Sequence, residues 1–70
     1  MITLEAQLQC AERALAMRRK EYPALVARGK LRRATAEREL AGMTAIVETL
    51  TRLVQHEHAR QGDLFTEARS

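Results

Sequence analysis

Aromatic side chains and cysteine are nearly absent from this sequence. Tyr22 and Phe65 are the only aromatic residues, so any core must be built from aliphatic side chains, and platforms for stacking single-stranded nucleic acid are missing. The single cysteine, Cys10, cannot form an internal disulfide. Its neighbours offer no metal-ligand spacing and no nucleophile partner. We therefore interpret it as a half-buried helix residue in a reducing compartment.

Long apolar runs and catalytic motifs are also missing. No stretch reaches the length of a membrane span, and the first residues lack the basic segment and apolar run of a signal peptide. We expect a cytoplasmic protein that does not enter the membrane. No Ser/His/Asp set, paired carboxylates or glycine-rich phosphate loop is present. His56 and His58 are two residues apart, whereas the zinc pattern HExxH needs a spacing of four. We expect neither an enzyme nor a metal or other cofactor.

Positive charge is concentrated in one part of the chain. The net charge is +3, but residues 18–38 contain eight basic and two acidic residues, which leaves −3 for the remainder. Such a cluster could contact DNA phosphates weakly and without sequence preference. The candidate nucleic-acid residues are Arg28, Lys30, Arg32 and Arg33. The alternative is an ordinary solvated charged surface.

Apolar residues recur at helical spacing in two segments. The first predicts a helix over residues 3–21, with Thr3 as its N-cap. The apolar stripe of this segment comprises Leu4, Leu8, Ala11, Leu15 and Tyr22. Pro23 disfavours helical geometry at the preceding residue, so it should end this helix and begin a short one over residues 23–28. Gly29 should close that short helix in the left-handed conformation. A long helix is predicted over residues 33–60. Its apolar stripe has 3-4 spacing and comprises Leu40, Met43, Val47, Leu50 and Val54, broadened by Ile46 and Leu53.

Two apolar stripes joined by a short connection predict an all-α protein, an antiparallel helical hairpin with a short helix at the turn. The hairpin domain should cover residues 1–60, followed by a flexible C-terminal tail over residues 61–70. Gly42 should lie near Ala14 and allow close helix approach, unless it is simply a tolerated surface glycine. A two-helix hairpin leaves each stripe half exposed, so we expect a homodimer with four helices.

Two resemblances bear on function. Residues 25–50, in which Gly29-Lys30-Leu31 leads into a charged helix, look like the short helical modules common in bacterial and phage proteins. Gln61-Gly62-Asp63-Leu64-Phe65 is similar to the pentapeptide by which many bacterial proteins bind the replication sliding clamp. That pattern is Gln, a variable residue that is often Leu, then Asp or Ser, then Leu, then Phe or Leu. Gly62 is the one departure.

The clamp resemblance implies a role for each matching residue. Leu64 and Phe65 would enter an apolar pocket on the clamp, Gln61 would hydrogen-bond at a neighbouring polar subsite, and Asp63 would fix an extended backbone. The protein would then modulate or inhibit DNA replication. Three alternatives remain open: a basic DNA-associated or regulatory module acting through residues 18–38, a structural oligomerisation protein, and a coincidental motif in which Leu64 and Phe65 fold back onto the hairpin.

Overall fold

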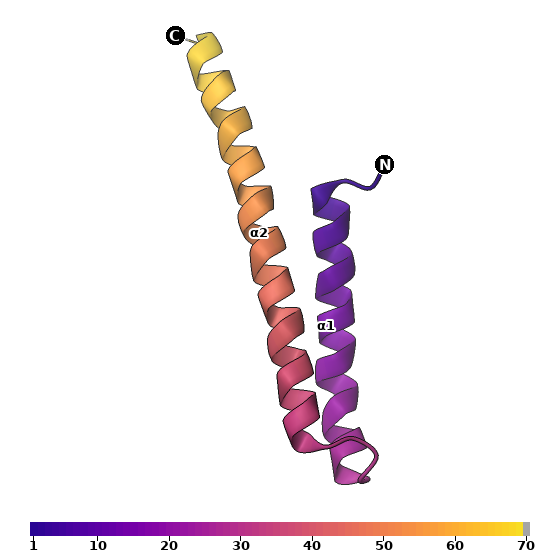
Figure 1. Ribbon diagram of the computed structural model, residues 1–70. Helices are drawn as coiled ribbons and strands as arrows, with labels where there is room; N and C mark the ends of the chain where they lie inside the picture. The colour runs from indigo at the N-terminus through magenta and orange to yellow at the C-terminus, as the bar shows by residue number, and fades with distance from the viewer. Residues whose placement is uncertain (70) are drawn as a thin grey trace.

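Two antiparallel helices form a narrow hairpin in the computed structural model (Figure 1), which describes the backbone of residues 1–69 and the side chains of residues 1–60. Helix α1 spans Leu4–Ala27 and helix α2 spans Arg33–Arg69, with no strand among the described residues. The hairpin measures 61 × 20 × 17 Å. The predicted all-helical hairpin is therefore confirmed.

Helix α1 begins as its sequence predicts. Thr3 has extended backbone angles, and its hydroxyl oxygen accepts a hydrogen bond of 3.1 Å from the backbone N–H of Ala6. Glu5 adds an acidic side chain to the first turn. The cap satisfies one of the free N–H groups at the helix start, and the carboxylate interacts favourably with the helix dipole.

The two helices expected on either side of Pro23 are joined into one. Helix α1 continues through Pro23 to Ala27, so the structure shows no separate short helix at the turn. Proline removes one backbone hydrogen bond and crowds the preceding turn. Packing offsets this cost, because Tyr22, Leu25 and Val26 are all half-buried in the last turns of α1.

Gly29 ends α1 in the way predicted. Its φ of +71° is the only positive value in the described backbone. The N–H of Gly29 bonds to the carbonyl of Val26 at 3.0 Å, and the N–H of Lys30 bonds to that of Leu25 at 2.9 Å. This pair of bonds is the Schellman motif, which requires a left-handed residue at this position. It reverses the chain within a few residues and thereby sets the antiparallel pairing.

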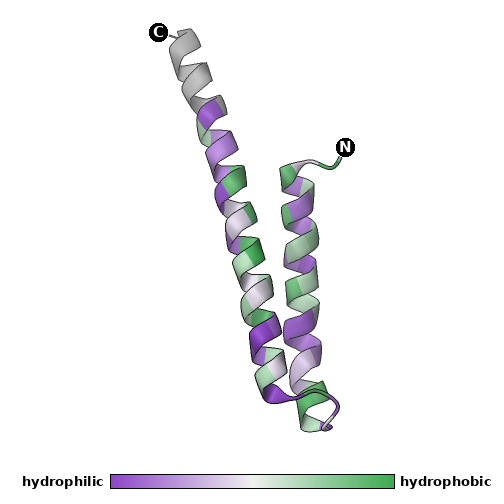
Figure 2. Ribbon diagram, in the orientation of Figure 1, coloured by the Kyte–Doolittle hydropathy of each residue, from purple (hydrophilic) through white to green (hydrophobic). Residues whose placement is uncertain are grey.

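The core is a single thin seam between the helices. Within residues 1–60, only Leu15 and Ala36 are buried. Leu8, Leu40, Met43, Val47, Leu50 and Val54 are half-buried along the predicted stripes. Figure 2 shows hydrophobic residues recurring along both helices between hydrophilic ones. The stripe prediction is confirmed for these residues, whereas Ile46 and Leu53, expected to broaden it, remain 50% and 45% exposed.

Gly42 does not mediate a close helix approach. It is exposed, and a Cβ atom built on it would have no heavy atom within 4 Å. Successive residues of a helix point about 100° apart around its axis. Because Met43 points into the seam, its neighbour Gly42 points away from it. The predicted packing against Ala14 was wrong, and the surface-glycine alternative holds.

The far end of α2 also differs from expectation. The second helix was predicted to end at Arg60, but α2 continues through Gly62 to Arg69. An isolated glycine costs a helix only about 1 kcal/mol, and the flanking residues are compatible with helix. The structure thus shows helical backbone over residues 61–69 where a flexible tail was expected.

Candidate functional site

The open end of the hairpin is fixed by one polar contact. The Nε2 atom of His58 lies 2.6 Å from Oε1 of Glu5, which links the first turn of α1 to α2. Both side chains are largely exposed. It is the only ion pair within residues 1–60, and it carries a full charge pair only when His58 is protonated. Beyond this level α2 continues without α1 beside it (Figure 1).

The clamp-like pentapeptide falls on that continuation. Gln61, Asp63, Leu64 and Phe65 belong to the backbone span of α2, and their side chains lie outside the described part of the structure. Their roles therefore remain those implied by the resemblance. The segment begins three residues after His58, which makes the last polar contact between the two helices among residues 1–60.

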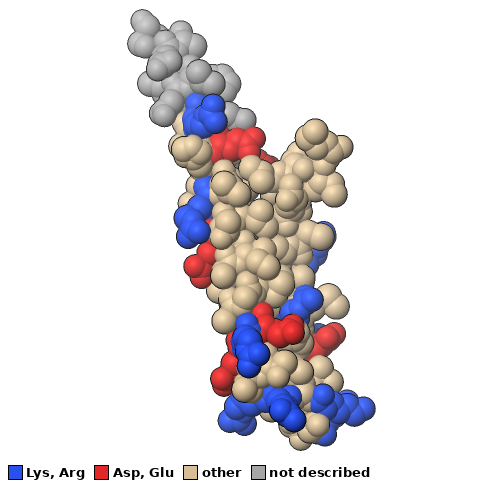
Figure 3. All heavy atoms as spheres, viewed as in Figure 1, with Lys and Arg blue, Asp and Glu red and all other residues tan. Residues whose placement is uncertain are grey.

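The basic residues predicted to contact nucleic acid come together at the turn. Arg28 caps α1, Lys30 lies in the connection, and Arg32 and Arg33 stand at the start of α2. All four are exposed, and none has a carboxylate within ion-pair distance among residues 1–60. Figure 3 shows lysine and arginine side chains gathered over this end of the hairpin.

The start of α2 is electrostatically unusual. Its first turn contains no acidic residue, although the N-terminal end of a helix dipole favours anions. Arg32 and Arg33 instead place two cations there, each at a cost of about 0.3–1 kcal/mol. Glu37, the first acidic residue of α2, comes only after this turn. The unpaired N–H groups and the arginines together would attract an anion.

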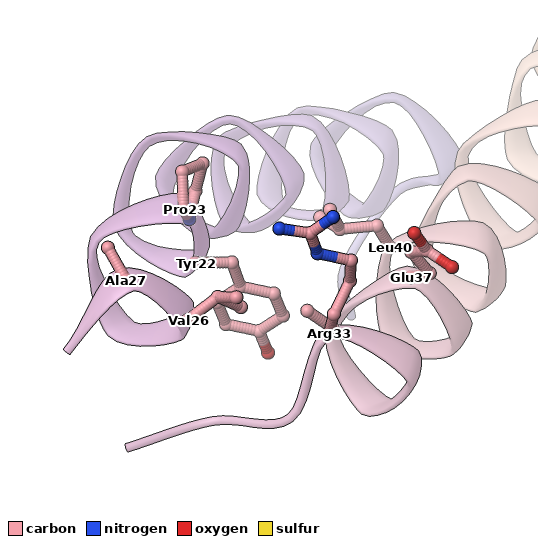
Figure 4. A pocket seen from close by; sticks show the side chains of 8 residues that line it. Tyr22, Pro23, Val26, Ala27, Arg33, Glu37 and Leu40 are labelled. Carbon is pink, nitrogen blue, oxygen red and sulfur yellow. The ribbon is translucent and has the colours of Figure 1, made fainter. Parts of the chain in front are cut away.

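A shallow hollow beside the turn was not predicted. It lies between the last turns of α1 and the first turns of α2 (Figure 4). Its lining is Tyr22, Pro23, Val26, Ala27, Arg33, Ala36, Glu37 and Leu40. The hollow forms because α1 continues past Pro23, which the spacing of apolar residues alone did not reveal.

Tyr22 also ties the two helices together near this hollow. Its hydroxyl donates a hydrogen bond of 3.2 Å to Glu39 Oε2. The aromatic ring was predicted to follow the apolar stripe of the first helix, and it is half-buried there. The cross-helix bond to Glu39 could not be predicted, because it depends on the register of the two helices.

The remaining candidates form no reactive cluster. Within the described residues, no group of three His, Cys, Asp or Glu side chains could hold a metal ion. Cys10 is exposed rather than half-buried as expected, because it lies off the α1 seam. Within the described part of the chain, neither helix contains an apolar stretch long enough to cross a membrane.

Comparisons with known proteins add no further assignment. A scan of protein families, a search of curated proteins and a search of solved structures each found no match. Arguments about function therefore rest on the residues themselves.

Proposed function

We propose that this chain is a small interaction protein that binds the bacterial sliding clamp through Gln61-Gly62-Asp63-Leu64-Phe65. The observation that carries the proposal is the match of this peptide to the clamp-binding pattern at every position except Gly62. The position of the peptide supports it, because the segment follows the last described contact between α1 and α2 at His58. The hairpin would then serve to present the peptide.

The expected affinity is modest. Burying Leu64 and Phe65 contributes about 1.5–3 kcal/mol each. Binding as an extended peptide requires the end of α2 to unwind, which opposes binding. That cost is small for a helix end with no neighbouring helix, and Gly62 lowers it by about 1 kcal/mol. The two side chains together contribute about 3–6 kcal/mol, so we expect a dissociation constant that is micromolar or weaker, with about −8 kcal/mol as the strongest binding free energy expected.

A calorimetric titration of the full chain into a purified bacterial sliding clamp tests the proposal. We expect binding in this range, and we expect Leu64→Ala combined with Phe65→Ala to abolish it. The matched control is Thr66→Ala with Glu67→Ala, next to the pentapeptide, which should bind like the wild type. Absence of binding at about a hundred micromolar clamp, or equal loss in the control, would refute the assignment.

The same double alanine variant distinguishes the clamp motif from a structural role. If Leu64 and Phe65 served the hairpin, replacing them would lower the melting temperature markedly. We expect the far-ultraviolet circular dichroism and the melting temperature to stay close to those of the wild type. A large drop in melting temperature would make the motif a coincidence.

We propose binding of DNA phosphates at the turn as a second candidate function. Arg32 and Arg33 support it, because they stand at the start of α2, where cations weaken the helix and a bound anion would offset their repulsion from the helix dipole. Binding of this kind carries no sequence information, so duplex DNA of any sequence should bind.

Salt dependence tests this candidate. Removing one cation that pairs with a phosphate should reduce the slope of log affinity against log salt by about 0.9. Arg32→Ala with Arg33→Ala should therefore reduce the slope by about 2, whereas Arg13→Ala with Arg52→Ala, outside the basic cluster, should leave it nearly unchanged. A fluorescence anisotropy titration with duplex DNA at low salt that shows no binding would contradict the candidate.

A further inference from the structure

The middle of one lateral side of the hairpin carries no charged residue. Arg18 borders it, because its guanidinium donates a hydrogen bond of 3.2 Å to the carbonyl of Ala14. Each helix contributes one stripe of residues at 3-4 spacing to this side. We call it the uncharged face. It comprises Gln7, Cys10, Ala14 and Met17 of α1, and Gly42, Ile46, Thr49 and Leu53 of α2. A shallow groove that brings Gln7 next to Ile46 and Thr49 places the two stripes on the same side.

The opposite side is charged. A groove there is bordered by Glu12 and Arg19 from α1 and by Glu48 from α2. In the view of Figure 3, uncharged residues cover the central strip of the hairpin, and charged side chains lie along its edges and toward its two ends. The two sides of one hairpin therefore differ sharply in what they can pack against.

The exposed area is too large for a compact monomer. The chain exposes 5938 Å², whereas a compact protein of 7.9 kDa should expose about 4,400 Å². The narrow shape of the hairpin, 61 × 20 × 17 Å, accounts for part of the excess. The uncharged face contributes large apolar side chains, because Met17, Ile46 and Leu53 remain substantially exposed. The excess of roughly 1,500 Å² over a compact protein of this mass is larger than the roughly 800 Å² that each partner buries in a standard interface.

Charge identifies a second copy as the occupant. In a two-fold dimer the same surface meets itself, so charged residues near the axis would face like charges. Only the uncharged face avoids this. Shape agrees, since Ile46 lies one turn from Gly42, where nothing lies within 4 Å of an added Cβ atom, so a partner side chain can enter beside Ile46.

The charge distribution also selects the orientation. Residues 18–38, around the turn, carry a net charge of +6 and the rest of the chain −3. A parallel pair would set two basic ends side by side, whereas an antiparallel pair sets each basic end against the acidic remainder of its partner. We propose that a second copy of this chain packs antiparallel on the uncharged face, forming a four-helix bundle with Ile46 and Leu53 in the interface.

Analytical ultracentrifugation of the full chain tests the interface. The wild type should sediment at twice the chain mass at about a hundred micromolar. Ile46→Lys with Leu53→Lys should sediment as a monomer while retaining its helical circular dichroism, because both residues are exposed in the hairpin. The control is Ala41→Lys with Gln55→Lys, which adds the same charge seven residues either side of Glu48, on the charged side. It should remain a dimer.

A second variant keeps the test decisive if the first fails to fold. Cys10→Lys changes the other helix of the same face and should also give a monomer. A wild type of monomer mass, or dimers that survive both changes, would overturn the proposal.

Orientation is tested separately with a pyrene label. In a Cys10→Ser, Arg28→Cys variant, the only label lies at the turn. An antiparallel dimer places the two labels at opposite ends, so excimer fluorescence should be absent. Strong excimer emission from a dimer would refute the antiparallel orientation. These outcomes do not depend on clamp binding, since none of the changed residues belongs to the pentapeptide.

Discussion

Leu15→Ala is expected to lower the free energy of unfolding by about 2–3 kcal/mol. Leu15 is 6% exposed and is the only large side chain buried within residues 1–60. Replacing a buried leucine by alanine costs about 2–5 kcal/mol, depending on how far the surroundings can close over the cavity. The lower part of this range applies because the seam is thin and bordered by half-exposed side chains that can move inward. A domain of this length has about 4–10 kcal/mol of total stability, so the loss is a large part of it.

Urea denaturation followed by circular dichroism measures this loss. The matched control is Ile2→Ala, which also truncates an aliphatic side chain but at a position that is 69% exposed and precedes α1. We expect the control to change the free energy of unfolding by less than about 0.5 kcal/mol. Equal effects of the two changes would refute the reasoning, since the seam around Leu15 would then not be what holds the helices together.

Three further changes probe the backbone and the caps. Gly42→Ala should raise the free energy of unfolding by about 1 kcal/mol, because the added methyl group meets no atom of the hairpin. The change is made in the monomeric Ile46→Lys, Leu53→Lys background, and a lower urea midpoint would show that the glycine is needed for packing. Gly29→Ala should lower the melting temperature by several degrees, because φ of +71° costs an L-residue about 1–2 kcal/mol; an unchanged melting curve would mean that the turn relaxes freely. Thr3→Ala should cost about 1 kcal/mol through loss of the cap, and hydrogen exchange should accelerate mainly in the first turn of α1; uniform acceleration along both helices would contradict a local role.

The features that the sequence predicted well are those decided by local chemistry. A threonine before an apolar stripe marked the start of α1, because a side-chain oxygen there satisfies a free N–H group. Gly29 was correctly expected to be left-handed at the end of the helical segment that follows Pro23, although that segment is the last turn of α1 and not a separate helix. The 3-4 spacing of Leu40, Met43 and Val47 identified the buried side of α2, because every other placement would expose more apolar surface.

The features that the sequence predicted poorly depend on a balance between local backbone preferences and packing between the two helices. Pro23 is locally a helix breaker, but the last turn of α1 packs against α2 and outweighs it. Gly42 was assigned to the seam from an estimate of register, and an error of one residue rotates a helix position by about 100°. The prediction of a binding site at Gln61, Asp63, Leu64 and Phe65 comes from a short motif. Such a motif carries no information about how the helices pair, so the hairpin fold neither supports nor contradicts that prediction.

The tight turn at Gly29 has a consequence for how the chain reaches its native state. Contacts near it join residues close in sequence, such as Tyr22 and Glu39, whereas the contact between Glu5 and His58 closes a loop of more than fifty residues. Short loops close at lower entropic cost, and proteins rich in local contacts fold in microseconds to milliseconds. The two helices should therefore zip together from the turn outward. The ends that meet last would also be the first to separate, so the junction that precedes the clamp-like peptide should open many times before the rest of the hairpin unfolds once.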